Sequence, residues 1–513
     1  MANQETKSSR AIPFQMELEA IGPKPMCESN APFFGHPYVR SLIDSRLDAY
    51  YTFIHPCFPV LPPAVAPHPH AQPHSMPDLQ SQNLREMTSP LTLAIAALLA
   101  MVPSYEARQE VSDTSSRCEL AHALSKSALQ KLDDDMETDS LPPRPRLHPD
   151  ISPNLEGILA LFFSALYEYC HRGNISKTRK HLASAIAAAM DADLHNSGPS
   201  APEAVRRSWW MITYFANQLS IMHALPPLIR VNDPCLRTPY PHCEDVFGTW
   251  RSLLRAQSLH LTVSTRTEIE EGIESFKMLE ETLASCVHDI DQPHTISLPQ
   301  SSDTKAIDNW NTISRIAVHS ARIKLYRAAA FADVPVFVDR HCDMAAIGVD
   351  LHKANSPKSP ESIVATVSSS WYTLEQSDLA REEDLSRSCL SSALAVIRLF
   401  RKLTISQKPV LNYSCLNDQD ASQYSWPLTV PLLACSAMQA CYVLVATLCQ
   451  MRASTGLDNS SILETERTTE EIRHGLETTM EIYSLYDARF AWVKAMYDEL
   501  KGVYMVAFAD NSL

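Results

Sequence analysis

The spacing of apolar residues is the feature that most limits how this chain can fold. Apolar side chains recur at steps of three and four residues through most of the sequence, which gathers them on one face of an α-helix. The sequence contains no useful length of strand-type alternation and no internal repeat. The pattern predicts an all-α fold, a large array of packed antiparallel helices with no substantial sheet. The helices of residues 154–223 are expected at its centre.

Size and composition narrow the function classes. A length of 513 residues exceeds what one ordinary core supports, so two closely packed lobes or one large helical array is expected. The chain has 11 glycines against 35 prolines, whereas phosphate-binding loops and tight strand-to-helix turns require glycine, so an α/β nucleotide enzyme is disfavoured. The formal net charge of −15 repels phosphate backbones and favours protein partners over autonomous nucleic-acid binding.

The cysteines, the N-terminal sequence and the longest apolar segment all indicate a soluble intracellular protein. The 13 cysteines show no C-x2-C spacing, and Cys435, Cys441 and Cys449 stand in apolar runs, where a thiol behaves as a small hydrophobic group. The N-terminal sequence resembles neither a signal peptide nor a transit peptide.

Residues 425–449 are long enough to span a bilayer. They include two prolines and polar residues and lack a clustered Lys/Arg flank, so a buried core helix is favoured over a membrane span.

A helix followed by a proline-rich strap is expected over residues 200–241. Ser200 and Glu203 have the spacing of a capping box, which predicts the start of the helix. Pro226 and Pro227 should end it, and the polar, proline-punctuated sequence beyond them predicts a surface strap. The apolar face of this amphipathic helix comprises Val205, Trp209, Ile212, Ala216, Leu219 and His223.

Other helices are expected earlier in the chain. One ends at His55-Pro56 and Phe58-Pro59, and its apolar positions are Leu42, Leu47, Tyr50, Tyr51 and Ile54. Ser89-Pro90 starts a buried helix. Residues 154–173 predict a helix capped by Gly173, with Leu155, Leu159, Phe162, Leu166 and Tyr169 on one face. Residues 175–195 predict its antiparallel partner, in which the alanines at 183–189 allow close approach.

Later in the chain, residues 244–284 and 306–333 are expected to be helical. Residues 291–305 and 351–362 are expected to be loops. The last third, from Leu374 to Phe508, should alternate helices with short polar breaks.

These landmarks together resemble the middle homology region, the regulatory domain of fungal zinc-cluster transcription factors. The resemblance rests on the His-Pro-x-Phe-Pro element at residues 55–59, the basic-Trp-Trp helix at 206–210, the Pro-Pro break, and a strap with Asp233 and Pro239-Tyr240-Pro241. Two places depart from the family. Ala224 and Leu225 replace the usual Gly-Arg, and Asp193 replaces the glycine of Asp-Leu-Gly-Leu-His.

The resemblance is best over residues 37–245 and suggests three regions. These are a disordered tail at 1–35, the middle homology region at 36–245 and a C-terminal helical region at 246–513 packed on it. Zinc-cluster regulators bind DNA through an N-terminal six-cysteine module, but this sequence has only Cys27 before Cys57. The chain is therefore expected to lack the zinc cluster and to bind no metal or cofactor.

The resemblance implies a fungal-type transcriptional regulator of a metabolic or secondary-metabolite gene set. It should act in the nucleus, or shuttle to it from the cytoplasm, through DNA-bound transcription factors or co-regulators, without strong DNA binding of its own and without a membrane. A homodimer and a small-molecule effector remain open. The alternative function is a small-molecule-sensing binding module with no direct role at promoters. An enzyme is not expected, because the sequence lacks the common catalytic motifs and offers no catalytic residue.

Trp209, Trp210 and Tyr214 are the candidate ligand-binding residues, because aromatic side chains supply much of the wall of small-molecule sites. Ordinary core packing is the favoured alternative for them. A flexible loop is likewise favoured over a metal site at His68, His70 and His74, since no Cys or carboxylate lies nearby in the sequence.

Two other groups of residues are interpreted as structural. The Cys and His of residues 242–245 and 341–343 are adjacent, and adjacent residues rarely form a catalytic dyad. The basic clusters Lys177-Arg179-Lys180 and Arg206-Arg207 are short, which favours solvated helix faces over phosphate-binding patches.

Overall fold

A computed structural model describes most of the chain, and the statements below concern that part. The described residues are 46–63, 89–100, 114–137, 147–223, 226–230, 233–241, 248–265, 278–286, 302–331, 378–405, 431–453, 459–487 and 490–508. They are predominantly helical and include no strand, which confirms the predicted all-α fold. The predicted tail at 1–35 and the predicted loop at 351–362 lie outside the described residues.

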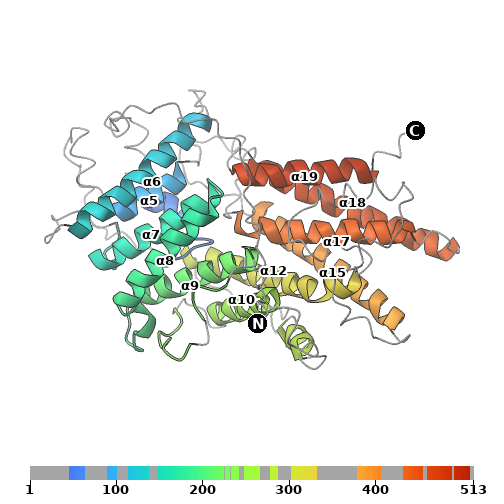
Figure 1. The fold of residues 1–513 in the computed structure, drawn as a ribbon, viewed down its shortest axis with the longest axis horizontal. Coiled ribbons are helices and arrows are strands. Elements are labelled where there is room, and N and C mark those ends of the chain that lie inside the picture. The colour runs from blue at the N-terminus through green and yellow to red at the C-terminus, as the bar shows by residue number, and fades with distance from the viewer. Residues whose placement is uncertain are drawn as a thin grey trace, which may run out of the picture.

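The helices form two neighbouring groups (Figure 1). The first group comprises α3 (Arg46–Phe53), α5 (Pro90–Leu99), α6 (Thr114–Glu137), α7 (Pro153–Cys170), α8 (Ile175–Asp191) and α9 (Glu203–His223). The second comprises α15 (Asp378–Ile405), α17 (Ala434–Ala453), α18 (Asn459–Asp487) and α19 (Ala491–Phe508). Helices α10 (Thr249–Thr265) and α12 (Ser302–Ala330) lie between them, and residues 278–286 are also helical. Short 3-10 turns occur at η2 (Leu194–Asn196) and η5 (Pro431–Leu433).

Local capping residues explain where several helices begin and end. Ser89 accepts a hydrogen bond from the amide of Thr92 at the start of α5, and Ser152 accepts one from Leu155 at the start of α7. Each serine precedes a proline in the first helical turn, where the missing N–H costs nothing. Gly173, between α7 and α8, has a φ of 60°, as its predicted capping role requires. Helices α7 and α8 pack against each other as the predicted pair.

One hydrophobic core runs through both groups of helices. It extends from Tyr50 in α3 to Ala507 near the end of α19. A smaller cluster joins α10, α12 and residues 278–286. The expected region boundary at 245/246 falls within residues 242–247, outside the described part of the chain. The core on either side of that boundary is nevertheless continuous, so the C-terminal helices and the first group share one interior.

Helix α17 corresponds to the long apolar segment in the sequence. Among the described residues it is the one helix long and apolar enough to cross a membrane by length and composition, and 78% of that window is buried inside the protein. It packs against α12, α15, α18 and α19. Packing against four neighbouring helices is typical of a helix in the core of a protein.

The structure corrects the expected beginning of α9 and shows how completely this helix is enclosed. The helix begins at Glu203, so Ser200 is not its N-cap residue, and Pro202 directly precedes the first helical residue. The helix is amphipathic in sequence, as expected, but its polar face is buried as well. Every residue from Arg206 to Met222 is buried, because α7, α8, α10 and the chain after α3 surround it. The predicted apolar face is one part of an almost completely enclosed helix.

Two further boundaries differ from the sequence-based expectation. Helix α12 starts at Ser302, inside the loop predicted at 291–305, because its first turn is held by contacts with distant residues. Helix α6 was not predicted, and it extends to Glu137. Its last residues are charged, so no apolar periodicity marks the end of the helix.

Candidate functional site

Three residues far apart in the sequence meet in a buried charge network. Asp303, in the first turn of α12, accepts hydrogen bonds from both terminal nitrogens of Arg207 on α9, at 2.9 and 2.7 Å. Its Oδ1 also lies 2.9 Å from Nε2 of His55, just beyond α3. The side chains of His55, Arg207 and Asp303 are 0%, 1% and 3% exposed. We call these three residues the buried charge network.

The turn that carries His55 is held in place from two sides. The hydroxyl of Tyr50 donates to the carbonyl of Phe58 and accepts from the amides of Val60 and Leu61. From α12, Nδ2 of Asn309 donates to the Pro56 carbonyl at 2.9 Å, and Nε1 of Trp310 donates to the Cys57 carbonyl at 3.3 Å. These bonds supplement the turn's own backbone hydrogen bonds, in which the amides of Cys57 and Phe58 donate to the carbonyl of Ile54.

The protonation states of the network follow from its contacts. Burial alone would raise the pKa of Asp303, but the hydrogen bonds from Arg207 and His55 outweigh it and hold that pKa well below its usual range. Burial lowers the pKa of His55, so this imidazole is neutral near pH 7. Because a carboxylate only accepts hydrogen bonds, the His55 proton must be on Nε2. Nδ1 of His55 is buried and forms no hydrogen bond with any residue that the structure describes.

The network is suited to joining distant elements of the chain. Arg207 is also bound by Glu203, one turn earlier on α9, through a 2.8 Å contact from its Nε. One guanidinium thus lies between two carboxylates, and each buried charge has a partner of opposite sign. All three network side chains are almost completely buried. The arrangement connects the turn after α3, the middle of the chain and the start of α12 through charge-assisted hydrogen bonds.

The structure places the three predicted ligand-binding residues in the packed interior. Trp209, Trp210 and Tyr214 are 0%, 5% and 3% exposed. Trp210 donates its indole N–H to the carbonyls of Thr238 and Pro239 and lies against the ring of Tyr240, so it holds the strap. The indole N–H of Trp209 is buried and has no hydrogen-bond partner in the described part of the chain. Their positions match the core-packing alternative.

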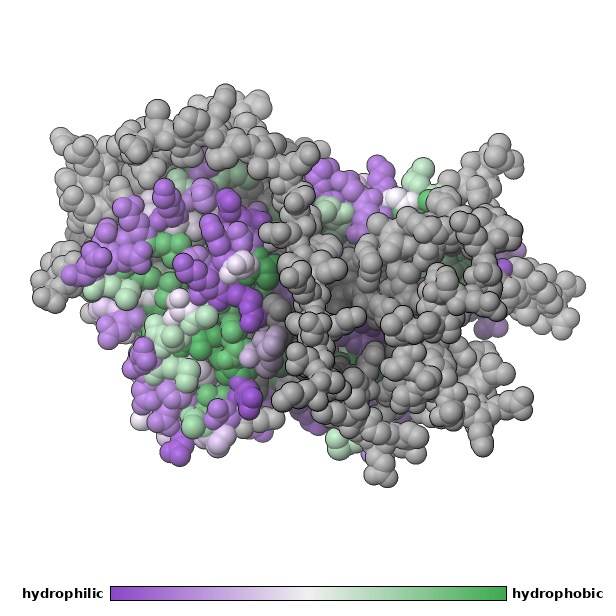
Figure 2. All heavy atoms as spheres, in the orientation of Figure 1, coloured by the Kyte–Doolittle hydropathy of each residue, from purple (hydrophilic) through white to green (hydrophobic). Residues whose placement is uncertain are grey.

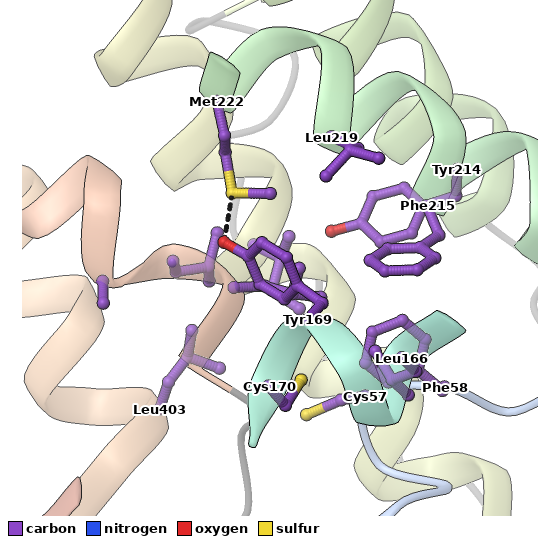
Figure 3. Packing of buried hydrophobic residues seen from close by; sticks show 14 of the residues in the cluster. Cys57, Phe58, Leu166, Tyr169, Cys170, Tyr214, Phe215, Leu219, Met222 and Leu403 are labelled. Atoms are coloured by element: carbon purple, nitrogen blue, oxygen red, sulfur yellow. Dashed lines mark hydrogen bonds between the residues drawn. The ribbon is translucent and has the colours of Figure 1, made fainter. Parts of the chain in front are cut away.

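The close packing around Tyr214 is visible in Figure 3. Phe215 of α9 approaches Phe58 edge to face, with ring centroids 6.3 Å apart. The hydroxyl of Tyr169 on α7 lies 3.1 Å from the sulfur of Met222. The side chains of Cys57 and Cys170 lie beside each other below these rings. Burial raises the pKa of Cys170 well above its usual value, which makes that thiol unreactive.

The strap is also tied to the turn that follows α8. The amides of Arg237 and Thr238 donate to the carbonyl of His195, and the Thr238 hydroxyl donates to the carbonyl of Leu194. Asp193, at the start of this turn, has a φ of 57°. It is the one non-glycine residue with a positive φ in the described part of the chain. The polar strap predicted after the Pro-Pro break is therefore confirmed as non-helical between residues 233 and 241.

The two basic clusters behave differently. Lys177 and Lys180 are exposed and Arg179 is half-buried, in broad agreement with a solvated helix face. The same expectation for Arg206 and Arg207 was wrong, because both are buried. Arg206 donates to the backbone carbonyls of Ala201 and Pro199, and Arg207 belongs to the buried charge network. Both guanidinium groups are buried because the segments around α9 place carbonyl and carboxylate acceptors in the interior, and the two arginines donate hydrogen bonds to them.

Several other candidates lie outside the described residues. These are His68, His70 and His74 and the Cys-His sequences at 242–245 and 341–343. Among the residues that can be described, no group of three or more His, Cys, Asp or Glu side chains is arranged to hold a metal ion.

Sequence reasoning missed Asp303, because it stands in a polar stretch and its partners are 96 and 248 residues away. Its one local signal is an acidic residue in the first turn of a helix, which is common for electrostatic reasons alone.

Comparison with family models, with curated proteins and with solved structures found no significant match.

Proposed function

We propose that this chain is a transcriptional regulator of fungal type that acts through its helical region and through partner proteins. The supporting observation is that the separate parts of the resemblance pack together. His55 of the His-Pro-x-Phe-Pro element and Arg207 of the basic-Trp-Trp helix share Asp303. Trp210 of that helix binds the strap at Thr238 and Pro239. Parts that were recognised independently thus contribute to one interior.

Asp193 gives a second line of support for the resemblance. The family carries a glycine in this register, and here the replacing aspartate has a φ of 57°. Glycine adopts that conformation without steric cost, and Asp tolerates it better than most residues. A position that requires a left-handed backbone accounts for glycine in the family pattern. The departure at Asp193 is therefore compatible with the same turn.

The regulatory unit that we propose is longer than the region of best resemblance. Asp303 lies on α12, well beyond residue 245, and yet it binds both His55 and Arg207. The core is also continuous from α3 to α19. We therefore propose that residues 36–245 work only together with the C-terminal helices. A fragment that ends near residue 245 would lack the Asp303 carboxylate that binds both His55 and Arg207.

We further propose that the regulator reaches promoters in the nucleus through DNA-bound partners. The net charge of −15 opposes binding to phosphate backbones. The packed positions of Trp209, Trp210 and Tyr214 give no support to the small-molecule-sensing alternative. The genes that the regulator would control are proposed from the resemblance alone as a metabolic or secondary-metabolite set.

Two assays test this proposal together. In a mobility-shift assay the purified chain should bind duplex DNA no better than weak nonspecific binders, with a dissociation constant of about 10⁻⁴ M at physiological salt. Fused to an unrelated DNA-binding domain, the same chain should change the output of a reporter gene. Tight, sequence-selective binding by the pure chain would contradict the partner-dependent mechanism, and an unchanged reporter under all growth conditions would contradict a role in transcription.

A further inference from the structure

Positive charge is concentrated where α6, α7 and α8 meet on this otherwise acidic chain. Nη1 of Arg172, just after α7, lies 3.3 Å from Nδ1 of His122 on α6. Its Nε lies 3.4 Å from Oε2 of Glu168. Nζ of Lys177, in the first turn of α8, lies 3.8 Å from the other oxygen of Glu168. These contacts bring cationic groups from neighbouring helices to one place.

Two exposed lysines extend this group. Lys126 follows His122 by about one turn of α6, and Lys180 follows Lys177 by about one turn of α8. Within the described part of the chain, neither lysine forms an ion pair. We call Lys126, Arg172, Lys177 and Lys180 the basic patch. Figure 2 shows hydrophilic residues interspersed with hydrophobic ones on the side of the molecule where α6 and α8 lie in Figure 1.

The basic patch has a net positive charge toward solvent. Among the described residues, Glu168 is the carboxylate in contact with Arg172 and Lys177, and its side chain is only 4% exposed, whereas those of Arg172 and Lys177 are 40% and 51% exposed. One buried carboxylate therefore offsets part of the charge of four outward-facing cations. The first turn of α8 adds the positive end of a helix dipole at the same place.

The two histidines beside the basic patch respond to this charge. Burial lowers the pKa of His122, and the positive charges of Arg172, Lys177 and Lys126 lower it further. Burial together with Lys180 and Lys177 likewise lowers the pKa of His181. Several cations therefore lie close enough to each of these imidazoles to oppose its protonation.

We propose that the basic patch binds a peptide segment rich in Asp and Glu from a partner protein. Exposed ammonium and guanidinium groups from three elements can each donate to a separate carboxylate of such a segment. Lys126 and Lys180 are available for this because neither is held in an ion pair by another described residue. A buried acid below the cations keeps them close together at a surface where they would otherwise repel one another.

The surroundings favour a short acidic peptide over nucleic acid. Asp133, Asp134 and Asp135 follow Lys126 on the same helix, and seven residues of α-helix span only about 10 Å. The charge of Asp133 also acts on His181, so acidic side chains border the basic patch. A duplex extends past so small a patch in both directions, and its phosphates would approach these carboxylates within about one Debye length at physiological salt.

This inference deepens the proposed function, because it assigns a chemistry to the partner through which the regulator would act. It rests on that function only in the choice of a protein partner. Peptide binding is measured on the purified chain, whereas the role in transcription is measured in cells. A failure of one is therefore distinguishable from a failure of the other.

The test is fluorescence anisotropy with the purified full-length chain and a labelled peptide that alternates Glu, Asp and Gly. A Gln/Asn peptide of the same length and a duplex DNA of similar charge serve as comparison ligands. The patch variant is Lys126→Glu with Lys180→Glu. The matched control is Lys305→Glu with Arg401→Glu, which makes the same charge change at exposed positions of α12 and α15.

The wild type and the control variant should bind the acidic peptide equally, and more tightly than the Gln/Asn peptide. The patch variant should bind the acidic peptide at least about tenfold more weakly, since several exposed charge pairs are lost or reversed. Equal binding by the patch variant, equal weakening by the control, or no binding by the wild type would overturn the proposal. Tighter binding of duplex DNA, lost in the patch variant, would identify a nucleic-acid surface instead.

Discussion

Replacement of Asp303 by asparagine tests the buried charge network while preserving the shape of the side chain. In the folded protein Asp303 is bound by two nitrogens of Arg207 at 2.9 and 2.7 Å and by His55 at 2.9 Å. The amide that replaces the carboxylate would have no charge, and its NH₂ group would face donors. Arg207 would remain buried with Glu203 as its carboxylate partner. Because removal of one partner leaves a buried charge incompletely compensated, Asp303→Asn should lower the free energy of unfolding by about 3 to 5 kcal/mol.

Asp308 on the same helix provides a matched control. Its carboxylate lies 3.1 Å from Nζ of Lys402, but the two side chains are 59% and 49% exposed. The same substitution, Asp308→Asn, should therefore cost less than about 1 kcal/mol. Urea unfolding followed by circular dichroism measures both variants. A loss below about 1 kcal/mol for Asp303→Asn, or equal losses for the two variants, would refute the reasoning that burial of this ion pair matters.

Three further predictions follow from single residues and from composition. Burial, with a contribution from Arg179, lowers the pKa of His223 from 6.5 to about 4, so the unfolded chain binds this proton first as the pH falls. Stability should be lost between these values, by at most about 3 kcal/mol, and urea titrations at several pH values should show a flatter profile for His223→Gln. Asp193→Gly should be neutral or stabilising by up to about 1 kcal/mol and Asp193→Ala destabilising by about 1 kcal/mol, whereas equal effects would argue against the left-handed turn. Elemental analysis of the purified chain should find no stoichiometric zinc, and a chelator should leave its melting temperature unchanged.

The parts of the fold that were predictable depend on local sequence. Helix α7 begins after Ser152 and is followed by Gly173, and both signals act within one turn of the helix. The apolar spacing between them identifies the helix without knowledge of its neighbours. The turn at His55-Pro56 and the break at Pro226-Pro227 were found in the same way, because proline limits the backbone wherever it stands.

The parts that were missed depend on contacts between distant residues. Asp303 makes the first turn of α12 favourable through Arg207, 96 residues earlier, and no local pattern contains that information. Arg206 and Arg207 look like solvent-exposed residues in the sequence, because a charge is buried only when its partners are present. The complete enclosure of α9 was hidden for the same reason, since polar residues such as Thr213 and Ser220 bond to carbonyls of their own helix.

A reporter assay with three fusions tests the central proposal most directly. The wild type, Asp308→Asn and Asp303→Asn are each joined to an unrelated DNA-binding domain and expressed at equal levels, with the DNA-binding domain alone as the baseline. We expect the wild type and Asp308→Asn to change reporter output equally and Asp303→Asn to lose most of that change, because its regulatory unit is no longer held together. Output equal to the baseline for the wild-type fusion under every growth condition, or full activity of Asp303→Asn, would contradict the account.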